Sequence, residues 1–237
     1  MRNFIRKIVD FVFPPTCPLC GGMLSGADGA CPECFAKLEL ISEPKCAYCG
    51  SPFEFMPDGG ARLVCIRCLK SKPKFDRCVS AAKYNEASRR IILPFKHGDR
   101  TNLSKFIAGV MAASGAELLA SADAIIPVPI HRLRMMKRKY NQAAEIARRL
   151  GSITGKPVMY DALARTKRTP SQGRMSAIDR KRNVRGAFAI VNPDALKGMK
   201  ILLVDDVLTS GATANECAKT LKGAGAKKVF VLTFARA

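Results

Sequence analysis

Residues 201–213 read ILLVDDVLTSGAT, and this stretch decides both the fold and the candidate site. The apolar residues 201–204 predict a buried strand. They are followed at once by Asp205 and Asp206, and then by a short loop of small and hydroxyl-bearing residues. Adjacent carboxylates repel each other and a glycine-containing loop costs conformational entropy, so stability alone does not explain this composition. We therefore expect a ligand to contact these groups.

Strand-like and helix-like segments alternate around this stretch. Four apolar segments predict strands: residues 77–84, 123–130, 199–206 and 227–237. Three segments with helical periodicity or helix stop residues lie between them: residues 102–120, 141–155 and 211–226. This alternation predicts an α/β fold with a mainly parallel sheet. In such sheets ligands bind beyond the carboxyl ends of the strands, which is where residues 205–213 fall.

The loop after the two acids is suited to an anion. Its backbone N–H groups and the N-terminus of the following helix form a cradle, to which the hydroxyls of Thr209, Ser210 and Thr213 add donors. Asp205 and Asp206, however, would repel a phosphate. A ligand with a phosphate at one end and hydroxyl groups at the other, such as ribose 5-phosphate, satisfies both halves of the stretch. The Gly-Lys-Ser/Thr sequence of a nucleotide-binding P-loop does not occur in it.

Eight of the ten cysteines form four Cys-x-x-Cys pairs. Each pair sets two thiolates on one tight turn, and two pairs complete the four-sulfur shell of a structural zinc ion. We therefore predict two Zn²⁺ ions, held by Cys17, Cys20, Cys31, Cys34, Cys46, Cys49, Cys65 and Cys68. Sequential assignment of the pairs is the simplest, and interleaved assignment stays open. A disulfide framework is disfavoured because nothing marks secretion, and an iron–sulfur cluster because the pairs are evenly spaced. Cys78 and Cys217 lie in apolar contexts and are expected to be buried.

The chain combines a strong positive charge with enough apolar residues for a core. It has 40 Lys and Arg against 19 Asp and Glu, and the net charge of +21 favours phosphate-bearing partners. No run of eighteen apolar residues occurs, so no membrane span is expected. Residues 1–16 predict an amphipathic helix that docks on the protein, with peripheral contact to an anionic membrane as the alternative. The start lacks the features of a signal peptide, and a cytoplasmic location is expected.

The pattern as a whole resembles a known family. The stretch ILLVDDVLTSGAT is similar to the motif of type I phosphoribosyltransferases. Residues 93–100 (LPFKHGDR), 127–147 and 168–188, together with the four cysteine pairs, resemble the ComF family of competence-associated phosphoribosyltransferase-like proteins. The resemblance covers nearly the entire chain. It implies a type I phosphoribosyltransferase-like, mainly parallel sheet flanked by helices, with a small zinc-ribbon module before it. The implied parts are an amphipathic helix at 1–16, a double zinc ribbon at 17–70 and a phosphoribosyltransferase-like domain at 75–237.

The resemblance also implies a ligand, phosphoribosyl pyrophosphate (PRPP), and roles for individual residues. Asp205 and Asp206 would hold the ribose hydroxyls, while His131 and Arg132 would hold the pyrophosphate. The 5-phosphate would rest on the loop residues Thr209, Ser210, Gly211, Ala212 and Thr213. A flexible loop with Gln172–Gly173 at its tip would close over the substrate and stabilise the departing pyrophosphate. Its candidate catalytic residues are Arg165, Lys167, Arg168 and Arg174. Mg²⁺ would bind together with PRPP.

Two functions stay open at this stage. One is an enzyme in which a nitrogen nucleophile displaces pyrophosphate from PRPP. The other is a non-enzymatic factor that handles single-stranded DNA during DNA uptake and uses the PRPP site for regulation. Its basic loops would follow a nucleic-acid backbone with salt-sensitive, sequence-tolerant affinity. Other competence proteins and the inner face of the membrane are further expected partners.

The acceptor of the transfer reaction also stays open. Thr209 stands where 6-oxopurine enzymes of this class usually carry an acid, which argues against hypoxanthine and guanine. A glutaminase activity is not expected, because Arg2 rather than a cysteine follows Met1.

Overall fold

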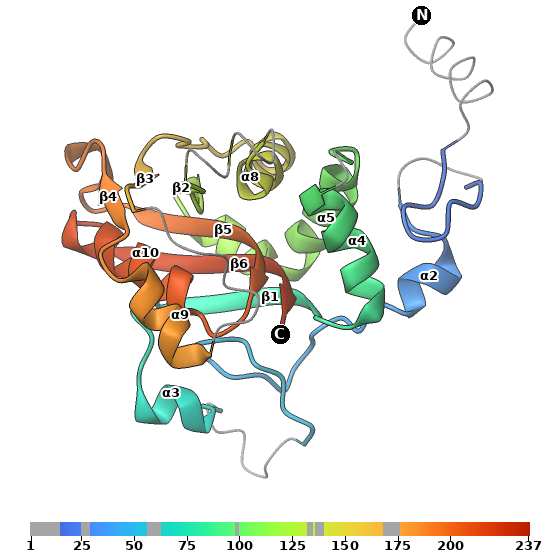
Figure 1. Cartoon of the computed structure of the whole chain (residues 1–237), viewed down its shortest axis with the longest axis horizontal. Coiled ribbons are helices and arrows are strands. Elements are labelled where there is room, and N and C mark those ends of the chain that lie inside the picture. The colour runs from blue at the N-terminus through green and yellow to red at the C-terminus, as the bar shows by residue number, and fades with distance from the viewer. Residues whose placement is uncertain are drawn as a thin grey trace, which may run out of the picture.

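The computed structural model describes residues 15–24, 29–55, 63–97, 100–131, 135, 140–167 and 176–237. Its centre is a four-stranded parallel sheet with the strand order β1-β6-β5-β2 (Figure 1). The strands are β1 (Arg77–Lys83), β6 (Lys228–Arg236), β5 (Lys200–Leu208) and β2 (Ala124–Pro127). The mainly parallel sheet predicted from the sequence is confirmed.

Helices cover both faces of this sheet (Figure 1). On one face lie α4 (Glu86–His97), α5 (Leu103–Ser114), α6 (Ala116–Ser121) and α8 (Gln142–Thr154). On the other lie α10 (Ala212–Gly223) and α9 (Ala177–Val184). Successive side chains of β5 point to opposite faces of the sheet, so the strand contributes to the core on each face. Leu202 and Val204 belong to the core formed with α4, α5 and α8, whereas Ile201 and Leu203 belong to the core formed with α10.

Two elements differ from the sequence-based expectation. The single helix expected over 102–120 is divided at Gly115 into α5 and α6. A Cβ at this position would lie 2.5 Å from the Leu232 side chain and 3.0 Å from the Met111 carbonyl oxygen, so glycine suits the close approach of this turn to β6. Strand β5 continues to Leu208, beyond the acids at which we expected it to end, because β6 pairs with it as far as Arg236.

A two-stranded antiparallel sheet accompanies the main sheet. It consists of β3 (Leu163–Arg165) and β4 (Phe188–Ile190), which is followed by a short 3-10 helix, η1 (Asp194–Leu196). The connection between the two strands contains α9, whose N-cap Ser176 accepts a hydrogen bond from the Asp179 N–H (3.1 Å). The tip expected at Gln172–Gly173 lies outside the described residues.

The cysteine-rich part forms two modules that relate differently to the sheet (Figure 1). The first contains α2 (Pro32–Ala36) and stands away from the sheet, whereas the second contains α3 (Ile66–Lys70) and lies on the side of α9 and α10. The segment that joins the modules extends the sheet edge beyond β1. Its Ile41 N–H donates to the Ala81 carbonyl (2.9 Å), and the Lys83 N–H donates to the Glu39 carbonyl (2.8 Å).

The segment between the second cysteine module and β1, residues 70–77, is tied to both parts of the chain. The Phe75 side chain is buried in the same core as Cys46, Cys49 and Cys68. The Lys74 N–H donates to the Asn215 side chain of α10 (2.7 Å). The second module is therefore continuous with the core of the α/β part. Residues 1–14 of the expected amphipathic helix lie outside the described residues, and no described helix has the length and apolarity needed to cross a membrane.

Candidate functional site

A cavity of about 450 Å³ opens at the carboxyl end of the parallel strands, where the sequence placed the candidate site. Several elements contribute to its wall: the end of β5 and the loop to α10, the segment after β2, the start of α8, and single residues of α4, β3 and α9. The lining residues that matter here are Lys96, Asn141, Gln142, Arg165, Arg180, Asp205, Asp206, Thr209, Gly211, Ala212, Thr213 and Ala237.

The paired acids form the floor of this pocket. The Asp206 side chain is buried, and its carboxylate makes an ion pair with the Lys96 ammonium, with 3.0 Å between Oδ2 and Nζ. The Asp206 N–H donates to Oδ1 of Asp205 (2.9 Å). Burial, followed by the neighbouring charge of Asp206, raises the pKa of Asp205 to about 7, while Lys96 and Arg165 oppose this rise. Near neutral pH the pair therefore carries less than its full two negative charges.

The loop that follows presents the N-terminus of α10 to the same pocket. Gly211 is the N-cap of this helix and has a φ of +77°, a conformation that glycine adopts without strain. Because glycine has no side chain, the first turn lacks a side-chain cap, and its N–H groups are suited to an anion. The Ser210 Oγ is buried and finds no hydrogen-bond partner within the described part of the chain. Ser210 does not line this pocket but a second hollow beside it, which is described below.

The structure brings some of the other predicted site residues to the pocket and not others. Arg165 lines the pocket, and its guanidinium lies over the Phe188 ring at 5.4 Å from the centroid. The Lys167 ammonium instead donates to the Arg185 carbonyl (3.2 Å), and Lys167 does not line the pocket. The carbonyl of His131 accepts the Met135 N–H (3.1 Å), and His131 is likewise not a lining residue. Arg132, Arg168 and Arg174 lie outside the described residues.

Sequence reasoning missed Lys96, Gln142 and Arg180 as lining residues. Lys96 lies within the stretch LPFKHGDR, which contributed to the family resemblance without receiving a role. Its partner Asp206 is more than a hundred positions away in the sequence, and no local pattern links the two. The indication available in the sequence was local: Lys96 directly follows the apolar residues 91–95.

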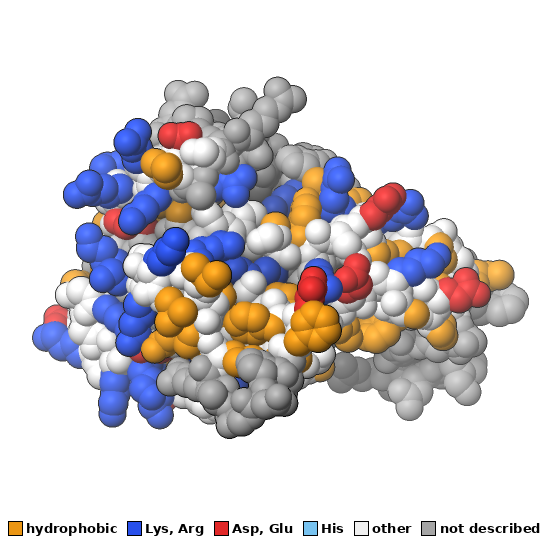
Figure 2. Space-filling view, turned by 90° about the horizontal axis from the view of Figure 1, so that it is seen from below, with side chains coloured by type: hydrophobic (Ala, Val, Ile, Leu, Met, Phe, Trp, Pro, Cys, Tyr) orange, Lys and Arg blue, Asp and Glu red, His pale blue; other side chains and the backbone are white. Residues whose placement is uncertain are grey.

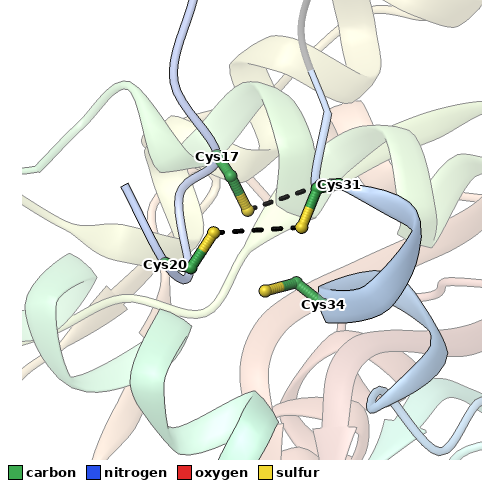
Figure 3. A group of neighbouring side chains, drawn as sticks. All are labelled: Cys17, Cys20, Cys31 and Cys34. Atoms are coloured by element: carbon green, nitrogen blue, oxygen red, sulfur yellow. Dashed lines mark hydrogen bonds between the residues drawn. The ribbon is translucent and has the colours of Figure 1, made fainter. Parts of the chain in front are cut away.

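The eight paired cysteines gather into two groups of four, the first of which is drawn in Figure 3. Within each group all sulfur atoms lie within 4.8 Å of one another, and the groups follow the sequential assignment. The Cys20 and Cys31 sulfurs are 3.8 Å apart, and those of Cys49 and Cys65 are 3.7 Å apart. A tetrahedral zinc ion with bonds of about 2.3 Å to sulfur requires sulfur–sulfur distances of about 3.8 Å. Both groups therefore fit a structural zinc centre with four cysteine ligands.

Backbone N–H groups prepare these sulfurs for a metal. Burial raises the pKa of Cys17, but hydrogen bonds from backbone N–H groups, among them that of Cys31 (3.4 Å), outweigh it and lower this pKa to about 6. The same balance lowers the pKa of Cys46 to about 7. Thiolates are the metal-binding form, so one sulfur in each centre favours that form before a metal binds. A hydrogen bond with the Cys31 side chain, followed by burial, instead raises the pKa of Cys34 to about 12, and burial raises the pKa of Cys49 and Cys68. Cys78 and Cys217 are fully buried, as expected, and burial raises their pKa.

A second hollow of about 1170 Å³ adjoins the pocket. It lies between α3 of the second cysteine module and the helices α9 and α10, and it shares Arg180, Thr209, Ala212 and Ala237 with the pocket. Eight of its lining residues are basic: Arg67, Lys72, Lys74, Arg180, Lys181, Arg182, Arg185 and Lys219. Glu216 is the one acid among the described residues that line it. Figure 2, seen from below, shows Lys and Arg side chains gathered on this side of the molecule. We call this hollow the basic groove.

The parallel sheet, the pocket beyond its carboxyl edge and the two four-cysteine groups define a phosphoribosyltransferase-like protein with an N-terminal double zinc ribbon. The corresponding domain families match this chain, the double zinc ribbon domain over residues 8–69 and the phosphoribosyl transferase domain over residues 141–237. The chain belongs to the ComF family, as its sequence resemblance indicated.

Three relatives illustrate this membership. Competence protein F of Haemophilus influenzae is 33% identical over 228 residues, covering 93% of this chain and 96% of the relative. The DNA utilization protein YhgH of Escherichia coli K12 is 30% identical, covering 92% and 96%. Competence protein ComFC of Bacillus subtilis is 24% identical, covering 84% and 80%. Among solved structures, an orotate phosphoribosyltransferase of Aeropyrum pernix is 18% identical with a TM-score of 0.37, covering 66% of this chain and 80% of that one.

Proposed function

We propose that the pocket binds PRPP. The observation that carries this proposal is the meeting, in one cavity, of a buried pair of acids and an uncapped helix N-terminus. Carboxylates accept hydrogen bonds from the ribose hydroxyls, and helix N–H groups donate to the 5-phosphate. A ligand that carries hydroxyls and phosphate on one sugar ring satisfies both at once.

Each candidate residue has a role in this proposal. Asp205 and Asp206 accept the 2′ and 3′ hydroxyls of the ribose. The 5-phosphate is received by the loop residues Thr209, Ser210, Gly211, Ala212 and Thr213. Arg165, in the pocket wall, faces the negative charge of the ligand. His131 and Arg132 contact the pyrophosphate, and Lys167, Arg168 and Arg174 act from the connection between β3 and β4 when it closes over the ligand.

Mg²⁺ fits this pocket as the companion of PRPP. The described residues that line the cavity offer carboxylate, hydroxyl and carbonyl oxygens, and none of them offers a thiol or an imidazole. This donor set suits a hard cation that remains bound mainly to its phosphate ligand. Bound to the pyrophosphate and the ribose hydroxyls, Mg²⁺ would neutralise charge on the leaving group. The two four-cysteine groups are proposed to hold one Zn²⁺ each as closed, structural centres.

The reaction that this arrangement supports is the displacement of pyrophosphate at the anomeric carbon. The bond from C1 to the pyrophosphate oxygen breaks, a bond from C1 to an acceptor nitrogen forms, and pyrophosphate leaves with the electron pair. Positive charge develops on the ribose, and the carboxylates of Asp205 and Asp206 stabilise it. Turnover is tested by pyrophosphate release in the presence of candidate nitrogen bases. Release that no base accelerates would restrict the role to PRPP binding.

Calorimetric titration with PRPP and Mg²⁺ tests the site itself. We expect the double variant Asp205→Asn/Asp206→Asn to lose at least about a hundredfold in affinity, because two charge-assisted hydrogen bonds are removed. The matched control is Asp194→Asn, which removes an exposed carboxylate that pairs with Lys197 on the surface. Equal affinity of the double variant and the wild type would reject the site.

The arrangement of the chain and its setting are part of the same proposal. We propose a helix at 1–16, a double zinc ribbon at 17–70 and a phosphoribosyltransferase-like domain at 75–237. The protein would act in the cytoplasm, with contact to the inner face of the membrane as the alternative. The names of its relatives, which refer to competence and to DNA utilization, support a role in DNA uptake beside other competence proteins.

A second candidate function, handling of single-stranded DNA, is favoured by the basic groove. Eight cations against one acid suit a phosphate backbone, and the groove opens directly beside the pocket. Arg67 on α3 and Arg182 on α9 bring charge from two different lining elements. Few aromatic side chains are available for base stacking, so the affinity would rest on phosphate contacts and depend strongly on salt.

Fluorescence anisotropy with a labelled single-stranded oligonucleotide tests this candidate. Six phosphate contacts with a single strand predict a loss of affinity of about three-hundredfold between 50 and 200 mM salt. We expect Arg67→Glu and Arg182→Glu each to weaken binding and reduce the salt dependence. The charge-matched control Arg90→Glu, on the exposed face of α4, should change neither. Equal effects of all three variants would place the binding outside the groove.

A further inference from the structure

The end of helix α4 is held in place by buried polar contacts that bring Lys96 to the pocket. Phe95 is fully buried and packs edge-on against the Tyr140 ring, with 5.8 Å between the ring centroids. The Tyr140 hydroxyl donates to the Phe95 carbonyl, and the buried Gln142 side chain donates to the Lys96 carbonyl (3.4 Å). The last carbonyls of a helix lack partners within the helix, so these contacts fix its end. Gln142, the first residue of α8, and Tyr140, just before this helix, thus support the end of α4 that carries Lys96.

From this position Lys96 makes an ion pair with one of the two pocket acids, Asp206. Its ammonium lies 3.0 Å from Oδ2 of Asp206, and both side chains are largely withdrawn from solvent. A partly buried ion pair of this kind is stronger than an exposed one but depends on both partners being present. Without Lys96, two neighbouring carboxylates would face the pocket with less positive charge to balance them.

The groups that surround Asp205 come from several elements. Asp206 precedes the loop on the same strand, Lys96 approaches from α4, Arg165 from β3, and the buried thiol of Cys217 from α10. Arg180 of α9 and Tyr84 line the same cavity. Of the cations in this group, Lys96 makes a direct ion pair with the Asp206 carboxylate.

We propose that Lys96 is a positioning residue of the pocket: through its ion pair it holds the Asp206 carboxylate in place and balances the charge of the acid pair, so that the adjacent acids can accept ribose hydroxyls together. This inference rests on the proposed binding of PRPP and adds a residue to that site. Binding of the sugar then requires that Asp205 give up its proton in the field of Lys96 and Arg165. Removal of the Lys96 cation raises the pKa of Asp205 further, so that fewer molecules have a fully charged acid pair at neutral pH.

The test is the pH profile of affinity for Mg²⁺ and PRPP between pH 6 and 9. In the wild type we expect affinity to rise as the pH passes through about 7, where Asp205 loses its proton. In Lys96→Met we expect about a tenfold loss at pH 7, a midpoint about one pH unit higher, and recovery of most of the affinity at pH 9. Lys96→Arg should keep the wild-type profile. The ligand's own protonation is common to all variants and cancels from the comparison.

A merely structural role gives a different result. A lysine that only supports the fold would lower affinity equally at every pH, and arginine would not restore the profile. Either a uniform loss or an unchanged affinity in Lys96→Met overturns the proposal. The matched control is Lys83→Met, which removes an exposed lysine that pairs with Glu39 on the surface. Urea unfolding checks that each variant is folded, and Lys96→Gln replaces Lys96→Met if the latter does not fold.

A measurement without ligand separates this inference from the proposed function. Protein labelled with ¹³C at aspartate carboxyls reports the titration of Asp205, whose signal is assigned by its loss in Asp205→Asn. We expect the midpoint of Asp205 to move upward in Lys96→Met and to remain in place in Lys83→Met. If neither the wild type nor any variant binds PRPP, the proposed function fails. An upward shift of the Asp205 midpoint in Lys96→Met would still support charge balancing by Lys96. An unmoved midpoint overturns it.

Discussion

Replacement of Asp205 by asparagine should stabilise the protein while it disables the site. In the free protein this carboxyl is enclosed by the pocket and lies beside Asp206, and its pKa rises from an ordinary value of 3.8 to about 7. Such a rise corresponds to a penalty of up to about 4 kcal/mol on the ionised form. Asp205 keeps part of its surface open to pocket water, which reduces the penalty. We therefore expect Asp205→Asn to be more stable by about 2–4 kcal/mol at pH 8.

The pH dependence gives the sign of this effect. An acid whose pKa is higher in the folded state binds more protons there, so the wild type loses stability as the pH rises from about 4 to about 7. Asparagine does not titrate, and it keeps an oxygen that can accept the Asp206 N–H. The advantage of the variant should therefore be smaller at pH 5.5 than at pH 8.

Urea unfolding at these two pH values, followed by circular dichroism, measures the difference. The control Asp194→Asn removes an exposed carboxylate and should change stability by less than about 0.5 kcal/mol at either pH. If Asp205→Asn were no more stable than the wild type at pH 8, or if its advantage in stability were independent of pH, the penalty assigned to the ionised form of Asp205 would be refuted. A gain in stability combined with a loss of PRPP binding is what a site under functional constraint predicts.

Three further predictions concern the second cysteine module and its contacts with the sheet, and Gly198→Ala, outside the module, is the control for the first. Gly50→Ala should destabilise the protein by more than about 2 kcal/mol in urea unfolding, because φ is +64° and a Cβ would lie 2.6 Å from the Cys78 carbonyl oxygen. Gly198→Ala, with φ of +74° and open space around it, should cost only about 1 kcal/mol. The buried Arg236 guanidinium donates to the Cys49 sulfur (3.6 Å), so Arg236→Leu should speed release to a chelator of the zinc ion at the second cysteine group. Equal release rates for both zinc ions in this variant would contradict the prediction. Complete removal of metal should lower the unfolding midpoint of the α/β part as well, and an unchanged midpoint would show that the module is independent of it.

Much of this architecture could be predicted because the deciding patterns are local. The apolar run before Asp205 predicts a buried strand, and β5 begins at Lys200, within one residue of the predicted start. The Cys-x-x-Cys spacing predicts two four-sulfur groups. The structure groups the pairs sequentially, which is the simplest of the assignments that the sequence allows. In both cases the residues that interact lie close together in the chain or repeat at a fixed interval.

The features that could not be predicted depend on contacts between distant segments. The helix is divided at Gly115, where the chain packs closely against Leu232 of the last strand. The continuation of β5 to Leu208 follows from its pairing with β6. The ion pair between Lys96 and Asp206 joins α4 to β5. None of these leaves a periodic trace in the sequence, because each is set by the three-dimensional path of the chain.

The burial of the second cysteine module was missed for a related reason. The sequence predicts a small zinc-ribbon module before the phosphoribosyltransferase-like domain, and no local pattern indicates that the two share a core. In the structure Cys46, Cys49 and Cys68 share a core cluster with Leu203 and Val231. The sequence does not show which side of the module faces the sheet.

A crystal structure of the protein with Mg²⁺ and PRPP tests the central claim most directly. The account predicts the 5-phosphate on the loop at residues 209–213, within hydrogen-bond distance of the backbone N–H groups at the start of α10. It also predicts the ribose hydroxyls within about 3 Å of the carboxylates of Asp205 and Asp206. Density for PRPP elsewhere on the molecule, or a pocket filled by the protein's own side chains with the ligand excluded, would contradict it.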